Sequence, residues 1–322
     1  MMIAFKIFRL FGLLTLIVAS WCGKTYGRDL RLPSVLETFG GTGVAYSNSG
    51  AAISTGIGSV YANPALMVVK RQYVLGGSYN WPVTGRHFYI GGVVDSVTSK
   101  MAAGLQYTGF LSNFEKSWQE KDQDSPIRSR TTLSVGYALA RLALGGSLNY
   151  TKGFQRDGLG WEKVQGTSFG FGLAAPLGKG LMLGASAQHL RNETTKALSP
   201  RVVRVGMAYQ ISLLALQLEY RKRSKLNFIE GFENPEGIYL DEDEHRLATE
   251  QLMIFGSSLK IYDMVQLIFS YGKNLTGQKR QILSGGAALS NHGASLSYQL
   301  SRPYLTSTQL HHVVQLTGSL KL

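Results

Sequence analysis

The sequence predicts an all-β protein: a transmembrane, antiparallel, up-and-down β-barrel of about fourteen strands, with an N-terminal segment inside its lumen. Three observations predict this fold: residues that alternate between apolar and small polar, connections whose lengths sort by strand parity, and tyrosines near one end of alternate strands. The composition agrees, because the 322 residues include 38 Gly and 16 Tyr and only 16% of them are charged. The body of the chain has no run of about 20 apolar residues, which a membrane-spanning helix requires.

Residues 1–27 have the pattern of an export signal peptide. Basic residues precede a short apolar core at 10–19, and small residues then offer cleavage after Ser20 or after Gly27. A tryptophan directly precedes Cys22, where a lipidation motif requires a small residue, so we do not expect a lipoprotein. Cleavage after Gly27 removes the lone cysteine and leaves none for a disulfide.

Residues 28–71 are rich in Gly, Ala and Ser, carry few charges and do not alternate like a strand. Eight strands enclose an interior that side chains fill, whereas about fourteen enclose a wider one. The inward positions of the strands predicted below are mostly small, including Gly76, Ser78, Gly104, Ser134, Gly136, Gly170, Gly172, Gly184 and Ser186. We therefore expect residues 28–71 to form a hatch that fills the lumen.

Residues 72–322 form the predicted barrel. In the segment 142–150 one face is large and apolar and the other is small or polar: Leu142, Leu144, Leu148 and Tyr150 against Ala143, Gly145, Ser147 and Asn149. Side chains of a strand alternate between faces, so a soluble sandwich can use this pattern, whereas a membrane-spanning barrel requires it. The predicted strands are 72–81, 87–94, 101–110, 129–139, 142–151, 166–174, 181–190, 201–209, 213–223, 249–260, 264–272, 280–289, 294–300 and 312–322. The segments around Ile254 and Gly285 alternate poorly, which leaves a count of roughly twelve to fourteen open.

The connections distinguish the barrel from the sandwich. Those after odd-numbered strands are 82–86, 111–128, 152–165, 191–200, 224–248, 273–279 and 301–311. Those after even-numbered strands are 95–100, 140–141, 175–180, 210–212, 261–263 and 290–293. Apart from the first, every odd connection is longer than every even one. Outer-membrane barrels have short periplasmic turns and longer outer loops, so we expect both termini in the periplasm.

Aromatic residues mark the same end of the strands. Six of the seven odd strands carry a tyrosine near the outer end, on the apolar face: Tyr79, Tyr107, Tyr150, Tyr220, Tyr271 and Tyr298. Such rings form a girdle at the membrane interface, whereas ordinary β-propensity would scatter them. The seventh strand has His189 at this height, and by parity we expect His189 and His312 to face lipid.

The last predicted strand ends the chain. Its apolar face carries Val314, Leu316, Leu320 and Leu322. A terminal amphipathic strand resembles the signal that the barrel-assembly machinery reads, although those signals usually end in Phe or Trp. We expect this machinery and outer-membrane lipids as partners. The net charge of +13 is spread over loops and strand ends without a nucleic-acid-binding motif, so it indicates a basic rim that meets anionic lipid headgroups.

The N-terminal segment resembles a known family. It contains Gly43-Val44-Ala45, a run of small residues at Ala51-Ala52, and Asn63-Pro64-Ala65 just before the first strand. This order resembles the N-terminal signature of the FadL-like outer-membrane transporters of hydrophobic compounds, which the PorV-like proteins share. The resemblance implies a fourteen-stranded barrel blocked by an N-terminal hatch, with Asn63, Pro64 and Ala65 as gating candidates.

The predicted strands place few charges inside the lumen: Arg204, Glu219, Arg221, Arg223 and Lys260. Glu219 and Arg204 lie on adjacent strands and are suited to a cross-strand pair. Arg204, Glu219 and Lys260 are therefore candidate ligand or gating residues, with pairing to the hatch favoured over contact with a solute. Charge inside a membrane span often serves function.

No catalytic constellation, cofactor motif or metal-ligand spacing is present in the sequence, so we expect neither an enzyme nor a cofactor. The acidic run 241–244 reads as a solvated loop, with cation binding as the alternative. Without an inward ring of charge, a general diffusion porin is disfavoured. Two hypotheses remain: passive uptake of hydrophobic, fatty-acid-like molecules through a hatch-gated lumen in the outer membrane of a Gram-negative cell, or a PorV-like docking and assembly partner that transports nothing.

Overall fold

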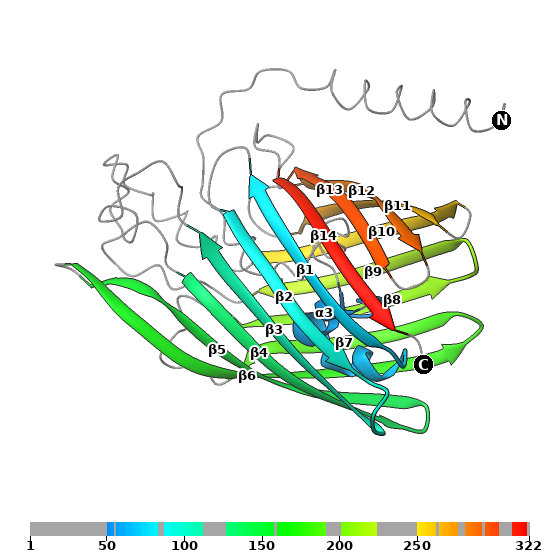
Figure 1. The fold of residues 1–322 in the computed structure, drawn as a ribbon, viewed down its shortest axis with the longest axis horizontal. Coiled ribbons are helices and arrows are strands. Elements are labelled where there is room, and N and C mark those ends of the chain that lie inside the picture. The colour runs from blue at the N-terminus through cyan, green and yellow to red at the C-terminus, as the bar shows by residue number, and fades with distance from the viewer. Residues whose placement is uncertain are drawn as a thin grey trace, which may run out of the picture.

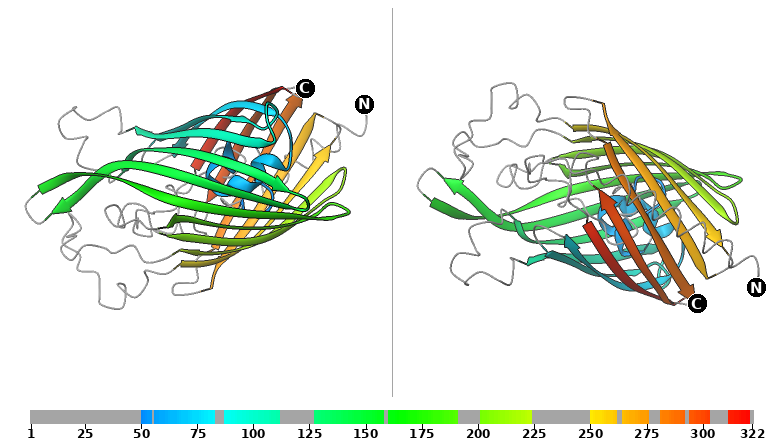
Figure 2. Two further views of the ribbon diagram at one scale, coloured as in Figure 1. Left: turned by 90° about the horizontal axis from the view of Figure 1, so that it is seen from below. Right: turned by 90° about the horizontal axis from the view of Figure 1, so that it is seen from above.

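The computed structural model describes residues 50–54, 56–82, 87–111, 127–157, 160–190, 201–223, 250–261, 264–275, 281–291, 294–302 and 311–320. They form one closed barrel with two short helices inside it (Figures 1 and 2). The predicted signal peptide at 1–27, the motif at 43–45 and the acidic run at 241–244 lie outside the described residues.

The barrel has fourteen strands, as predicted. They are β1 (Tyr73–Pro82), β2 (His87–Asp95), β3 (Met101–Leu111), β4 (Ile127–Leu139), β5 (Leu142–Asp157), β6 (Gly160–Gly178), β7 (Leu181–Leu190), β8 (Val202–Gln210), β9 (Leu214–Arg223), β10 (Glu250–Ile261), β11 (Val265–Asn274), β12 (Gln281–Asn291), β13 (Ala294–Arg302) and β14 (His311–Leu320). Each strand pairs antiparallel with its neighbours in sequence, and β1 pairs with β14 from Tyr73↔Leu320 to Pro82↔His311, which closes the barrel.

The two poorly alternating segments are full strands, β10 and β12. On β10, Leu252 and Ile254 are buried on the inward face and pack against Ile282 of β12. Both faces of β10 are therefore apolar at this point, which removes the alternation without removing the strand. On β12 two adjacent glycines, Gly285 and Gly286, interrupt the alternation of apolar and polar residues, and the strand is still formed.

The predicted connection at 152–165 is wrong. The strands β5 and β6 contain 16 and 19 residues, and their pairing continues to Asp157↔Gly160. About 9–11 residues suffice for a strand to cross a membrane, so this hairpin extends past its neighbours, as Figures 1 and 2 show. Only residues 158–159 connect the two strands, which makes this connection a second exception to the parity of loop lengths.

The outward face of the barrel is apolar and exposed. Leu75 is 70% exposed and Leu316 is 61% exposed, and the tyrosines Tyr79, Tyr107 and Tyr298 also lie on the exposed outer face. A continuous exposed apolar surface of this kind is the surface that a membrane-spanning barrel presents to lipid. No helix in the described part of the chain is long and apolar enough to cross a membrane.

The two helices inside the barrel are α3 (Ile57–Ala62) and the 3₁₀ helix η2 (Pro64–Val68). Asn63 separates them: its backbone is extended, and its side chain accepts a hydrogen bond from the backbone N–H of Ala65. Proline at the first position of η2 has no N–H to satisfy and has the φ angle that a helix start needs. The sequence Asn-Pro-Ala thus ends one helix and begins the next. Both helices lie in the lumen, seen in blue in Figure 2.

Candidate functional site in the barrel lumen

The lumenal segment, defined here as residues 50–54 and 56–72, lies against a wall of inward glycines. An added Cβ at Gly145 would lie 2.4 Å from the backbone N of Ala65, and one at Gly184 would lie 1.9 Å from the backbone O of Ala51. At Gly172 it would lie 2.1 Å from the Asn63 Oδ1 atom. Real Cβ atoms do not approach so closely, so these strands need glycine to admit the segment. Contact with the segment therefore accounts for four of the small inward residues noted in the sequence: Gly104, Gly136, Gly172 and Gly184.

Apolar packing fixes the two helices on the same side of the barrel. Ile57, Val60 and Met67 of the lumenal segment are buried in a cluster completed by wall residues Val74, Ile90, Val94 and Ala102. A Cβ at Gly104 of β3 would lie 2.6 Å from Val60 Cγ2. The helices therefore rest on β1–β6, which agrees with their contacts to these strands.

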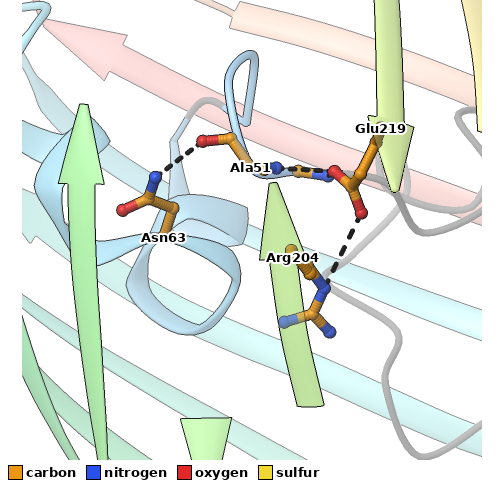
Figure 3. Close-up of polar contacts among 5 residues, drawn as sticks. Ala51, Asn63, Arg204 and Glu219 are labelled. Carbon is orange, nitrogen blue, oxygen red and sulfur yellow. Dashed lines mark hydrogen bonds and ion pairs between the residues drawn. The ribbon is translucent and has the colours of Figure 1, made fainter. Parts of the chain in front are cut away.

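Asn63 ties the segment to itself and to the wall. Its Nδ2 atom donates to the backbone O of Ala51 at 2.6 Å (Figure 3). The same atom donates to the backbone O of Leu173 at 2.9 Å. The first bond holds the turn at Ala51 beside the helices, and the second joins the segment to β6. The three predicted residues Asn63, Pro64 and Ala65 are thus buried at the point where the segment meets the wall.

Glu219 of β9 holds the beginning of the described segment. One carboxylate oxygen accepts hydrogen bonds from the backbone N–H of Gly50 at 2.7 Å and of Ala51 at 2.8 Å. The other lies 3.9 Å from Arg204 Nε of β8, and both side chains are buried (Figure 3). Charge-assisted bonds of this kind are about twice as strong as neutral ones. The structure therefore places Arg204 and Glu219 side by side and joins the pair to the segment.

Five of the six candidate residues belong to one chain of contacts. It runs from Arg204 through Glu219 and Ala51 to Asn63, with Pro64 and Ala65 next in sequence. The sixth, Lys260, lies opposite Gln266 near the short connection between β10 and β11 and is not part of this chain of contacts.

The other end of the segment is anchored where it leaves the lumen. Arg71 donates from Nη2 to the backbone O of Val97 at 2.6 Å and of Ser99 at 3.1 Å. The backbone N–H of Gln72 donates to Ser96 Oγ at 2.8 Å. The chain is therefore tied to the β2–β3 turn immediately before β1 begins.

The prediction that His189 faces lipid is wrong, because β7 contains a bulge. Pairing with β6 passes from Ala187↔Phe171 to Leu190↔Phe169, so Gln188 and His189 both face Gly170, and His189 has a φ of 58°. An extra residue in one strand shifts the side chains that follow it to the other face. The prediction assumed that side chains alternate regularly along the whole strand, and it therefore missed the bulge. The only signal was that β7 lacks the tyrosine found on the other odd strands.

The bulge places His189 against the lumenal segment. Its Nε2 atom lies 2.8 Å from the hydroxyl of Tyr61 in α3, and its Nδ1 atom lies 2.9 Å from Ser168 Oγ of β6. Tyr61 has no exposed surface, and His189 is 4% exposed. The guanidinium carbon of Arg130 lies 3.7 Å from the centroid of the Tyr61 ring, and that of Arg204 lies 5.7 Å from it. Tyr61 is thus held by an imidazole at its hydroxyl and by cations at its ring.

The other residue of the bulge, Gln188, orders the wall beside the segment. Its Oε1 atom accepts from Ser147 Oγ at 3.0 Å and from Asn149 Nδ2 at 3.3 Å, and Asn149 Oδ1 accepts from Thr132 Oγ1 at 2.8 Å. This polar layer crosses β4, β5 and β7.

Among the described residues no group of His, Cys, Asp or Glu could hold a metal ion. The polar contacts of the lumenal site therefore hold a peptide segment inside a closed barrel.

Comparison with known proteins identifies the fold. No family model matches the chain, and no curated protein matches it. Among solved structures, the Pseudomonas putida toluene transporter TodX is similar with a TM-score of 0.63 at 14% identity, covering 89% of this chain and all of that one. The Ralstonia pickettii toluene transporter TbuX gives 0.59 at 14% identity, covering 88% of this chain and 98% of that one. A Pseudomonas aeruginosa FadL homologue gives 0.57 at 13% identity, covering 87% and 97%. The expected FadL-like barrel is therefore confirmed as a fold.

Proposed function

We propose that this protein is an outer-membrane channel for passive uptake of hydrophobic small molecules, with the lumenal segment as its gate. One observation carries the proposal: among the described residues, the segment is held in the lumen by hydrogen bonds of side chains and not by strand pairing. Glu219 and His189 of the wall bond the segment, and Asn63 of the segment donates to the backbone O of Leu173. Contacts of this kind can break and re-form without disturbing the barrel.

The membrane orientation that we propose follows from the connections and the outer surface. The apolar outer face supports insertion in a bilayer. The connections at 112–126, 191–201 and 224–249 are longer than any at the opposite end and would form the outer surface. The short connections, the exit of the segment at Arg71 and both chain termini would then lie on the periplasmic side.

The entry route that we propose is apolar. Leu252, Ile254 and Ile282 form an inward cluster near the ends of β10 and β12 that adjoin the longer connections. An apolar solute captured by the outer loops would pass from this cluster toward the segment and leave by movement of the segment or by a lateral gap in the wall. We propose fatty acids and monoaromatic hydrocarbons as the two solute classes, since the similar structures include toluene transporters.

The gate is tested by deletion of residues 36–66, which removes α3 and most of η2 and keeps the anchor at Arg71. We expect the ion conductance of the protein in planar bilayers to rise, because the deletion empties the space beside the inward glycines. Uptake of a fatty acid and of toluene into liposomes that contain the intact protein tests transport, with protein-free liposomes as the control. Unchanged conductance would refute the gate, and uptake equal to that of protein-free liposomes would refute transport.

The second candidate function is that of a docking or assembly partner with a permanently closed lumen. The closeness of the contacts at Gly145, Gly172 and Gly184 favours it, because little free volume separates the segment from the wall. This function predicts a rise in conductance on deletion but no uptake by the intact protein, so the two measurements together separate the candidates.

A further inference from the structure

Two histidine–tyrosine hydrogen bonds of the barrel differ in what they join. In the described side chains, His312 of β14 bonds Tyr298 of β13 on the outer face, with Nδ1 and the hydroxyl 2.6 Å apart. His189 bonds Tyr61, which connects the wall to the lumenal segment. The first pair links two neighbouring strands that are already paired, whereas the second links two parts of the molecule that move relative to each other if the gate opens.

The neutral form of His189 fits its partners. A neutral imidazole has one nitrogen that donates and one that accepts, and each lies within hydrogen-bond distance of a hydroxyl that can do either. A protonated imidazole donates from both nitrogens and carries a positive charge, so the hydroxyl that donated to it must reorient.

The charged groups around this pair disfavour a further cation. Arg130 of β4 and Arg204 of β8 lie over the Tyr61 ring. Arg221 and Arg223 of β9 also face the lumen. Among the described residues, Glu219 of β9 is the acid that contacts the segment, and its carboxylate binds Gly50, Ala51 and Arg204. A charged His189 therefore adds like charge next to Tyr61, whose ring is already bounded by guanidinium groups.

We propose that Tyr61 and His189 form a proton-sensitive latch: neutral His189 fastens α3 to the β7 bulge, and protonation of His189 releases it. The latch rests on the proposed function, in which the lumenal segment moves. The latch lies at the bulge because a regular β7 strand would point His189 outward, away from Tyr61. Because Glu219 holds Gly50 and Ala51 and Arg71 anchors the other end of the segment, release loosens α3 between these two points.

Hydrogen exchange on the full chain in lipid bilayers tests the latch. We compare the protection of backbone amides in residues 57–68 at pH 7.5 and pH 5.5, with intrinsic exchange rates divided out. For the unsubstituted protein we expect protection to fall by up to about tenfold, the largest change that one proton produces when the pKa of its site differs between the two states by about one unit. The substitution His189→Gln keeps a donor and an acceptor but does not titrate, so protection should not depend on pH.

The control is His312→Gln, which removes the outer imidazole and should leave the pH dependence of the unsubstituted protein unchanged. Should His189→Gln fail to fold, Tyr61→Phe removes a single oxygen and should lower protection at pH 7.5 toward the value at pH 5.5. A segment whose protection does not change with pH in the unsubstituted protein, or changes equally in His189→Gln, overturns the latch.

Solute uptake measured on the same preparations separates the latch from the proposed function. A pH-dependent segment in a protein that takes up neither fatty acid nor toluene would refute transport and leave the latch intact. Uptake that is the same at both pH values, with a segment whose exchange does not respond to pH, would refute the latch and leave transport intact.

Discussion

Single inward residues decide whether the lumen accepts the segment. Gly145 and Gly146 are neighbours on β5 and show this directly. The first faces the lumen, with its missing Cβ 2.4 Å from Ala65 N, and the second faces outward with nothing within 4 Å. A methyl group is therefore excluded at one position and free at the next, although the two glycines are alike in sequence.

Gly145→Ala should displace η2 and loosen the segment, while Gly146→Ala serves as the matched control. Overpacking of a fitted interior costs about 1–3 kcal/mol, and here the cost falls on the contact between segment and wall. We expect higher basal conductance in bilayers for Gly145→Ala and unchanged conductance for Gly146→Ala. Equal conductance of the two variants would mean that the segment tolerates the added methyl group.

The alternation of individual residues was predictable from the sequence, and the position of His189 was not. Parity correctly assigned Arg204 and Glu219 to the lumen because β8 and β9 are regular there. It failed at His189 because the bulge depends on how β6 and β7 pair, and no local residue pattern marks it. The contacts of Asn63 with Ala51 and Leu173 were also beyond the sequence, since they need the fold to bring these residues together.

At the scale of elements, the bounds of a strand were predicted well where one face is apolar and the other small or polar. Twelve of the fourteen strands begin and end within two residues of the predicted positions. The exceptions, β5 and β6, continue past their neighbouring strands, and the alternation that identifies a strand is lost in this extension. Their continued pairing to Asp157↔Gly160 was therefore read as a loop.

The outer part of the β5–β6 hairpin should be dispensable for folding. We expect a barrel in which residues 154–163 are replaced by Asn-Gly, a pair suited to a two-residue hairpin turn, to fold and to keep Lys152 paired with Gln165. Retarded or advanced migration of unheated samples in gel electrophoresis, relative to boiled ones, reports the folded barrel. Identical migration of heated and unheated samples would show that the extension is needed to form the barrel.

At the scale of the whole molecule, closure explains why a chain with near-zero mean hydropathy, −0.01, exposes an apolar surface. Every second residue faces the lumen, so the average over the chain conceals the outer face. Closure between β1 and β14 also leaves no free sheet edge in the wall, which would otherwise expose unpaired backbone groups to lipid.

The orientation proposed above predicts which ends of the strands react from outside the cell. A cysteine at Gly237, in the connection between β9 and β10, should react with a membrane-impermeant thiol reagent on intact cells. One at Arg141, in the turn between β4 and β5, should react only after the cells are opened. Cys22→Ser in both variants removes the natural thiol. The reverse labelling pattern would invert the proposed orientation.

The position of the glycine wall in the chain has a consequence for biogenesis. The segment contacts β1–β9, which end by Arg223, whereas the seam joins β1 to a strand that begins at His311. A sheet that forms from β1 onward therefore contains every strand that the segment contacts while β10–β14, more than a third of the strands, are still missing. The chain can pack its own interior early, from an open side, and the last pairing then encloses a segment that never has to be threaded through a finished pore.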